Sequence, residues 1–202
     1  MGKAPRDVEP ARRRAALLSN HREAIAAMDF FTVPVLGCGL LYCLFIIHHA
    51  KRRILQCNIT RHPTTAWVSQ QFLEAFPQDA APRFLIFDRE HTFVGEMKQT
   101  AVNLGIRPVQ TPVRSAWQNG IAERWVGTCR RELLDHVIVL NRCHLKRLMT
   151  EYVRYYHDDR THLGLGKDTP AGRKAAQSPT VNAEVVSIPR LGGLHHRYDL
   201  AA

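Results

Sequence analysis

The order of apolar segments in this 202-residue chain predicts an α/β fold, in which a mixed sheet of five strands carries helices on both faces. Three strand candidates come first, at residues 25–33, 40–50 and 53–59; they are rich in β-branched and aromatic residues and suit an antiparallel meander. Helix and strand patterns then alternate, with short strands at residues 84–87 and 106–110. Residues 84–87 are apolar at every position, as expected for a strand that is covered on both faces.

Four helices are predicted between and after these strands. The first begins near Thr64 and ends before Pro77, and the second covers residues 97–104. The third covers residues 120–140, where apolar side chains recur at helical spacing, and the fourth covers residues 145–157.

The chain divides into three predicted regions. Residues 1–22 are a basic leader, rich in Arg, Ala and Pro, that we expect to be poorly ordered. Residues 23–172 form the folded core, and residues 173–202, which contain Pro179 and Pro189, are expected to be an irregular tail.

Composition indicates a polyanionic partner and an intracellular location. Lys and Arg number 28 against 18 Asp and Glu, a net charge of +10, although a merely basic soluble enzyme would show the same balance. The five cysteines form no pair of C-x-x-C motifs, which favours reduced thiols. The apolar segment 33–47 is shorter than the ~20 residues of a spanning helix, so we expect no membrane partner and a cytoplasmic protein.

Three carboxylates lie in unusual surroundings. Asp29 interrupts an apolar strand, Asp88 directly follows another, and Glu123 opens the third helix. An ionised Asp in an apolar strand is costly to bury unless it is paired or coordinated, so the three predict converging oxygen ligands for a divalent metal. Taken singly, each has another explanation: a hydrogen-bonded core carboxylate, a turn former before Arg89, and a first-turn residue that the helix dipole favours.

The surrounding motifs resemble the catalytic core of D-D-E transposases and retroviral-type integrases, within the ribonuclease H-like superfamily and especially bacterial insertion-sequence transposases. The resemblance covers roughly residues 25–172. Its motifs are MDFFTV at 28–33, LIFDRE at 85–90, GIR at 105–107, TPVRS at 111–115, QNGIAERW at 118–125, YYHDDR at 155–160 and TP at 169–170. Ala116, His157 and Thr161 depart from the family's usual residues, but no departure removes a carboxylate.

The resemblance implies a ribonuclease H-like fold and a metal-dependent polynucleotidyl transferase that cleaves DNA strands and transfers them during integration. Asp29, Asp88 and Glu123 would be both the catalytic residues and the ligands of two Mg2+ ions, with Mn2+ as a substitute. The implied partners are the ends of a mobile element, a target duplex and further copies of the chain. Fewer than thirty residues precede Asp29, so a separate helix-turn-helix protein is a further expected partner.

Two other functions stay open. One is a catalytically inactive or truncated transposase remnant that only binds DNA. The other is a nuclease of the same superfamily that cuts RNA–DNA hybrids, which the segment 118–123 makes the weaker alternative.

DNA contacts are expected around the third helix. Arg130 lies two helical turns after Glu123 and so on nearly the same face, with Arg124 and Arg131 flanking that line. Phosphate contacts from these arginines would position DNA without reading its sequence, whereas a solvated basic face is the alternative, above all for Arg131. Trp117 and Asn119, in the loop before the helix, complete the predicted DNA-contacting set; Trp117 would stack on an unpaired base or pack under the loop.

Overall fold

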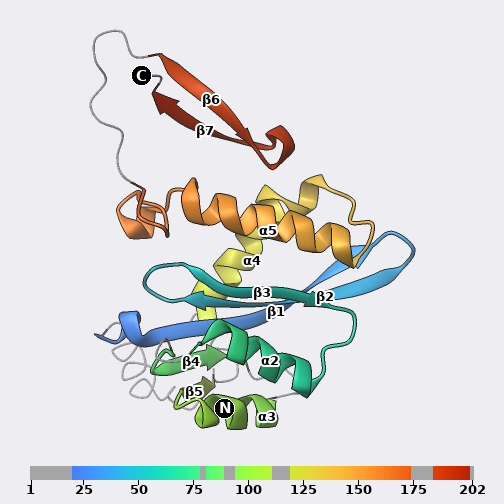
Figure 1. The fold of residues 1–202 in the computed structure, drawn as a ribbon, viewed down its shortest axis with the longest axis vertical. Helices are drawn as coiled ribbons and strands as arrows, with labels where there is room; N and C mark the ends of the chain where they lie inside the picture. Colours follow the sequence, from blue (N-terminus) through green and yellow to red (C-terminus); the bar gives the residue numbers. More distant parts are fainter. Residues whose placement is uncertain (1–19, 78–80, 89–93, 111–118, 174–183, 201–202) are drawn as a thin grey trace, which may run out of the picture.

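Five strands form one mixed sheet in the computed structural model, which describes residues 20–77, 81–88, 94–110, 119–173 and 184–200 (Figure 1). The strand order is β3-β2-β1-β4-β5, with antiparallel pairing among the first three and parallel pairing from β1 to β4 and from β4 to β5. The bounds are β1 (Ile25–Val35), β2 (Gly39–His48), β3 (Ile54–Thr60), β4 (Phe84–Phe87) and β5 (Arg107–Gln110). The predicted fold class is therefore confirmed.

Helices cover both faces of this sheet, as the strand patterns predict. On one side lie α4 and α5, and on the other α2 and α3 (Figure 1). Their bounds are α2 (Thr65–Ala75), α3 (Val94–Asn103), α4 (Gly120–Glu132) and α5 (Arg142–Asp158). Short 3-10 turns occupy Arg22–Ala24, Leu134–His136, Leu163–Leu165 and Leu191–Gly193.

Alternating side chains of the strands build two separate apolar cores. Under α4 and α5, the ring centroids of Phe45 and Trp125 lie 4.2 Å apart, and Tyr152 is fully buried with them. Under α2 and α3, Leu44 and Phe72 are fully buried. Each such side chain contributes roughly 1.5–3 kcal/mol through burial, so both helix pairs are held against the sheet by apolar contact.

The third predicted helix is shorter than expected, because α4 ends at Glu132 and not near residue 140. Leu133 leaves helical geometry (φ −137°, ψ −61°) while its side chain stays buried. Beyond the turn, the carbonyl of Val139 accepts a hydrogen bond from the backbone N–H of Leu36 at 2.8 Å. Pairing with the β1–β2 hairpin therefore replaces the continued helix, a long-range contact that local spacing does not encode.

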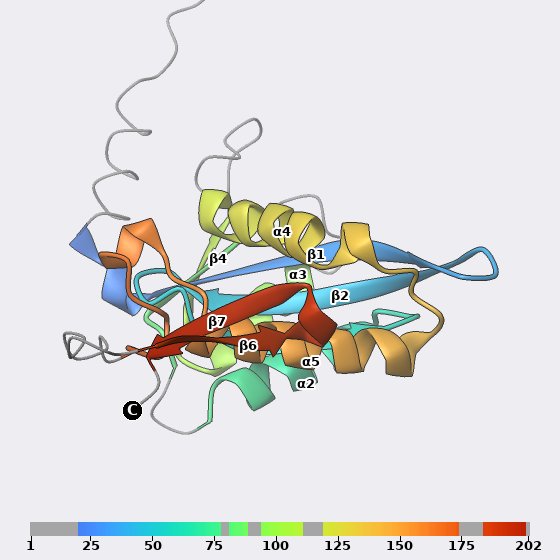
Figure 2. The same ribbon diagram turned by 90° about the horizontal axis from the view of Figure 1, so that it is seen from above.

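Residues 185–200 form an antiparallel hairpin, so the prediction of an irregular tail is wrong for this part of it. The strands are β6 (Val185–Arg190) and β7 (His195–Leu200), and they lie over α5 in two perpendicular views (Figures 1 and 2). Gly192 and Gly193 have positive φ angles (68° and 94°), as the tight turn between the two strands requires. The two glycines thus mark the turn of a hairpin, and Pro189 lies in β6, a strand with one open edge.

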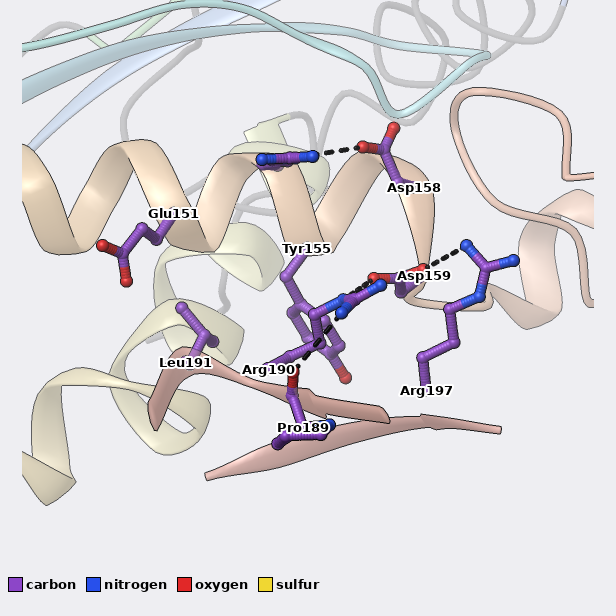
Figure 3. A pocket seen from close by; sticks show the side chains of 9 residues that line it. Glu151, Tyr155, Asp158, Asp159, Pro189, Arg190, Leu191 and Arg197 are labelled. Carbon is purple, nitrogen blue, oxygen red and sulfur yellow. Dashed lines mark hydrogen bonds and ion pairs between the residues drawn. The ribbon is translucent and has the colours of Figure 1, made fainter. Parts of the chain in front are cut away.

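Ion pairs attach this hairpin to the end of α5. The side chain of Asp159 is 4% exposed and contacts the guanidinium groups of Arg190 at 2.5 Å and Arg197 at 3.1 Å. Figure 3 shows these pairs at a cavity of about 300 Å3 that Tyr155 and Leu191 also line. Charge contacts thus hold the hairpin together with the packing of Leu191 and Leu194 against the core and the stacking of His195 on Tyr155. No helix in the described residues has the length and apolar character needed to cross a membrane.

Candidate active site

Asp29 lies in β1, and Asp88 directly follows β4, the parallel neighbour of β1. Ala27 of β1 pairs with Ile86 of β4, and each carboxylate lies two residues further along its own strand direction. Residues two apart on a strand point to the same face. This register sets the part of β1 that holds Asp29 next to the end of β4 that Asp88 follows, although 59 positions separate the two residues in the chain.

The face on which these carboxylates lie is the one that α4 covers. Ala27 and Phe31 lie two residues before and two residues after Asp29 on β1, and both belong to the core under α4 and α5. Phe84 and Ile86, which precede Asp88, belong to the same core. The Oδ1 atom of Asp29 accepts a hydrogen bond from the backbone N–H of Phe30 at 2.8 Å, which orients this carboxylate.

Glu123 reaches the same place from the first turn of α4. The helix start is anchored to β1 because the buried Asn119 donates from Nδ2 to the carbonyl of Met28 at 3.4 Å. Partial burial, and then the negative charges of Asp29 and Asp88, raise the pKa of Glu123 above its ordinary value. The three predicted carboxylates thus share one electrostatic environment.

The chemistry of this trio fits hard divalent cations. Mg2+ prefers carboxylate oxygens and takes one or two protein carboxylates per ion. A cation between the three would also remove the mutual repulsion that raises the pKa of Glu123. Across the described ranges, no group of three or more His, Cys, Asp or Glu side chains is already arranged to hold a metal ion, so binding would require the carboxylates to draw closer.

The three predicted DNA-contacting arginines have different surroundings on α4. Arg124 and Arg131 are exposed. Arg130 is half-buried: Nη2 donates to the carbonyl of Thr32 at 3.1 Å, and the guanidinium lies 5.8 Å from the ring centroid of Phe31. That Arg130 contacts phosphate stays a prediction, and these contacts show that it also holds α4 against β1.

The two residues predicted from the loop before α4 have different outcomes. Asn119 is 3% exposed and joins α4 to β1, so its amide serves the fold in this structure. That it also contacts DNA stays a prediction. Trp117 lies outside the described residues.

An ion pair near the carboxyl end of α4 was not predicted from the sequence. Arg160 binds both carboxylate oxygens of Glu132, with Nε at 2.8 Å and Nη2 at 2.7 Å, and the hydroxyl of Tyr152 donates to the same carboxylate at 3.0 Å. Burial and the charge of Glu132 raise the pKa of Tyr152 well above its usual range. The only sequence signal was the motif at residues 155–160, which does not identify a partner 28 residues away.

Known proteins match this chain more clearly in structure than in sequence. Residues 104–170 match the family model of the integrase core domain. No protein of curated function matches the chain.

Solved structures with the same fold come from retroviral integrases. The simian T-cell lymphotropic virus intasome, in complex with the PP2A regulatory subunit B56 gamma, aligns at 14% identity over 89% of this chain and 67% of that chain, with a TM-score of 0.59. The HTLV-2 integrase catalytic core in complex with magnesium, in its dimeric form, aligns at 13% identity over 74% and 94%, with a TM-score of 0.56. The BIV integrase catalytic core aligns at 14% identity over 74% and 91%, with a TM-score of 0.53.

The strand order, the two-sided helix packing and these alignments agree with one another. The chain has the ribonuclease H-like fold of retroviral integrase catalytic cores, and its residues 104–170 match the integrase core domain.

Proposed function

We propose that this chain is the catalytic core of a D-D-E transposase that cleaves DNA and transfers DNA strands with the help of divalent metal ions. The observation that carries the proposal is the parallel register of β1 and β4, which supports a shared site for Asp29 in β1 and Asp88 directly after β4, on the face that α4 covers. The electrostatic coupling of Glu123 to both carboxylates supports it. So does the fold similarity to an HTLV-2 core that was solved with magnesium.

The chain's own task in this reaction is to position charge. Asp29 stands on β1, Asp88 directly follows the paired strand β4, and Glu123 stands on a helix anchored to β1. The three carboxylates would thus be presented by, or next to, rigid elements. Mg2+ held by these residues would stabilise charge on the attacking and leaving oxygens of an in-line displacement. The nucleophile would be water in cleavage and a DNA 3′-hydroxyl in strand transfer.

The DNA partner follows from charge. A net charge of +10 and the exposed Arg124 and Arg131 on α4 would attract phosphates toward the carboxylates. The similar simian viral protein was solved within an intasome, and the HTLV-2 core in dimeric and trimeric forms. We therefore include further copies of this chain, assembled on DNA, in the proposal, together with a separate helix-turn-helix protein that finds the element ends.

The test is strand transfer with Mg2+ on labelled DNA ends, comparing the parent with Asp29→Asn, Asp88→Asn and Glu123→Gln. Each variant removes one ligand charge while keeping its shape, so we expect rates below about one hundredth of the parent's, as for the loss of one major electrostatic stabiliser. Glu151→Gln, which neutralises an exposed carboxylate on α5, is the matched control and should keep the parent's rate.

Two outcomes would contradict the proposal. A parent chain that binds the DNA ends but never joins or cuts them, with its described fold intact, would favour a DNA-binding remnant. Cleavage of RNA–DNA hybrids without strand transfer would instead identify a nuclease.

A further inference from the structure

A second basic site lies beside the start of α4, in a cavity of about 250 Å3. Four separate segments enclose it: the β2–β3 turn, the first half of α4, the last turn of α5 and the 3-10 turn Leu163–Leu165. The lining residues that matter for its chemistry are Arg52, Arg124, Trp125, Arg160, His162 and Gly164. None of the three carboxylates of the candidate active site lines this cavity.

The walls of this cavity carry excess positive charge. Arg160 is neutralised by its paired contacts with Glu132. Arg52 and Arg124 have no ion pair within the described part of the chain. Burial, and then the like charges of Arg124 and Arg22 set against a favourable contribution from Tyr156, lower the pKa of Arg52. Two guanidinium groups in the cavity wall therefore lack a counter-charge from the described residues, and a bound anion would lower their mutual repulsion.

A buried hydrogen-bond donor also lines the cavity. Trp125 is 1% exposed, and its indole Nε1 has no hydrogen-bond partner among the described residues. An indole N–H can only donate, and a buried donor without an acceptor is costly. The indole N–H is itself buried in the wall, so the charged groups that face the cavity are its arginines.

The backbone at Arg52 is held in a form that arginine rarely adopts. Its φ is 58°, in the left-handed region that favours glycine. Gly164 faces the guanidinium, since a Cβ added there would lie 3.6 Å from Nη2 of Arg52. A turn that needed only this backbone would be more stable with glycine, so the arginine side chain itself is the feature that requires explanation.

We propose that this cavity binds a backbone phosphate of DNA, with Arg52 and Arg124 as the charge partners and the buried indole of Trp125 as part of its wall. Arg124 follows Glu123 directly on α4, so one wall of the cavity belongs to the same helical turn as one of the carboxylates. The inference rests on the proposed function only for the identity of the polyanion. Its effect would be to position the DNA beside the site of chemistry without reading its sequence.

The test measures binding of a labelled DNA duplex against salt concentration, in a chelator so that metal and catalysis play no part. Arg52→Gly removes the guanidinium and at the same time suits the positive φ, and Arg124→Gln removes an exposed charge from a helix. The slope of log K against log salt is negative, and each lost phosphate contact should make it less steep by about 0.9. Each loss should also weaken binding roughly five- to tenfold at moderate salt. Arg147→Gln, an exposed arginine near the other end of α5, should change both far less.

Nuclear magnetic resonance of the 15N-labelled indole locates the contact. The Nε1 signal of Trp125, assigned with Trp125→Phe, should shift when the parent binds DNA and should not shift in Arg52→Gly. The proposal would be overturned if the salt-dependence slopes of Arg52→Gly and Arg124→Gln both equalled that of Arg147→Gln. An indole signal that responds to inorganic phosphate but not to DNA would also overturn it, because that identifies a small-anion site only.

These outcomes separate the two proposals. If the parent does not join DNA but Arg52→Gly and Arg124→Gln reduce the salt dependence of DNA binding, the phosphate site stands and the transposase proposal fails. If the parent joins DNA but these two variants bind DNA as the parent does, the transposase proposal stands and the phosphate site fails.

Discussion

Two half-buried histidines near Arg52 show how single residues tie the stability of this fold to pH. Burial, and then the charges of Arg52 and Arg22, lower the pKa of His49 to about 4. Burial, and then Arg160 and Arg52, lower the pKa of His162 to about 4. Both side chains are therefore neutral in the folded protein at a pH where a free histidine begins to protonate.

We expect the free energy of unfolding to fall as pH decreases from about 6.5 to about 4. In that window the unfolded chain, whose histidines titrate near 6.5, binds protons that the folded chain does not, so acid favours unfolding. Above about pH 6.5 both states are neutral and these groups contribute nothing. Urea unfolding at about pH 7 and about pH 5 measures the difference.

The control is the double variant His49→Gln, His162→Gln. Because glutamine does not titrate, its loss of stability between the two pH values should be clearly smaller than the parent's. An equal loss in parent and variant would show that other groups dominate the acid response.

At the scale of elements, the contact between the end of α4 and the segment after α5 depends on one ion pair. The side chains of Arg160 and Glu132 are only 24% and 23% exposed, and the charges meet through two-pronged hydrogen bonds. His195 of β7 also contacts this point, with Nε2 at 2.7 Å from the carbonyl of Glu132, while its ring stacks on Tyr155. Three elements thus converge on the last residue of α4.

Arg160→Met should lower the free energy of unfolding by about 2 kcal/mol, because it leaves the Glu132 carboxylate half-buried without its counter-charge. Adding Glu132→Gln should recover part of that loss, since the stranded charge is then gone. Urea unfolding of the parent, both single variants and the double variant gives the coupling free energy. Strictly additive effects would mean that the pair contributes nothing beyond packing.

For the whole molecule, the weakest attachment in the described structure is that of the β6–β7 hairpin. Most of its residues are half-buried or exposed, and Val185, Val186 and Tyr198 are exposed apolar side chains. Its anchor, Asp159, is almost fully buried between two arginines (Figure 3). A unit held by few charges opens more readily than one held by a buried core.

Asp159→Asn should therefore release the hairpin while the central sheet stays folded. Backbone hydrogen exchange in residues 185–200 should become faster, and exchange in β1 and β2 should stay as in the parent. Asp158→Asn provides the control, because Asp158 pairs at 3.9 Å with Arg154, whose side chain is 86% exposed. Equal exchange in residues 185–200 of both variants would show that the hairpin does not depend on this anchor.

The sequence was informative wherever local pattern and structure coincide. The apolar run at β4 was predicted at its true bounds, and the apolar surroundings of Asp29 and Asp88 were enough to predict that their oxygens converge with that of Glu123. Strand and helix periodicity is a local property, and a carboxylate in an apolar strand is visible in the chain itself.

What only the tertiary structure decided are contacts between distant segments. The sequence does not show that Arg130 donates to the Thr32 carbonyl or that Glu132 pairs with Arg160. Nor does it show that the segment after α4 pairs with Leu36 through Val139. The phosphate cavity has the same origin, since four segments bring its two arginines together. The chain by itself determined the strands and helices of the core sheet and its acidic residues, because these follow from neighbouring side chains. Packing decided where α4 ends, that residues 185–200 form a hairpin, and how charges from separate segments are paired, because these depend on which surfaces meet when the elements assemble.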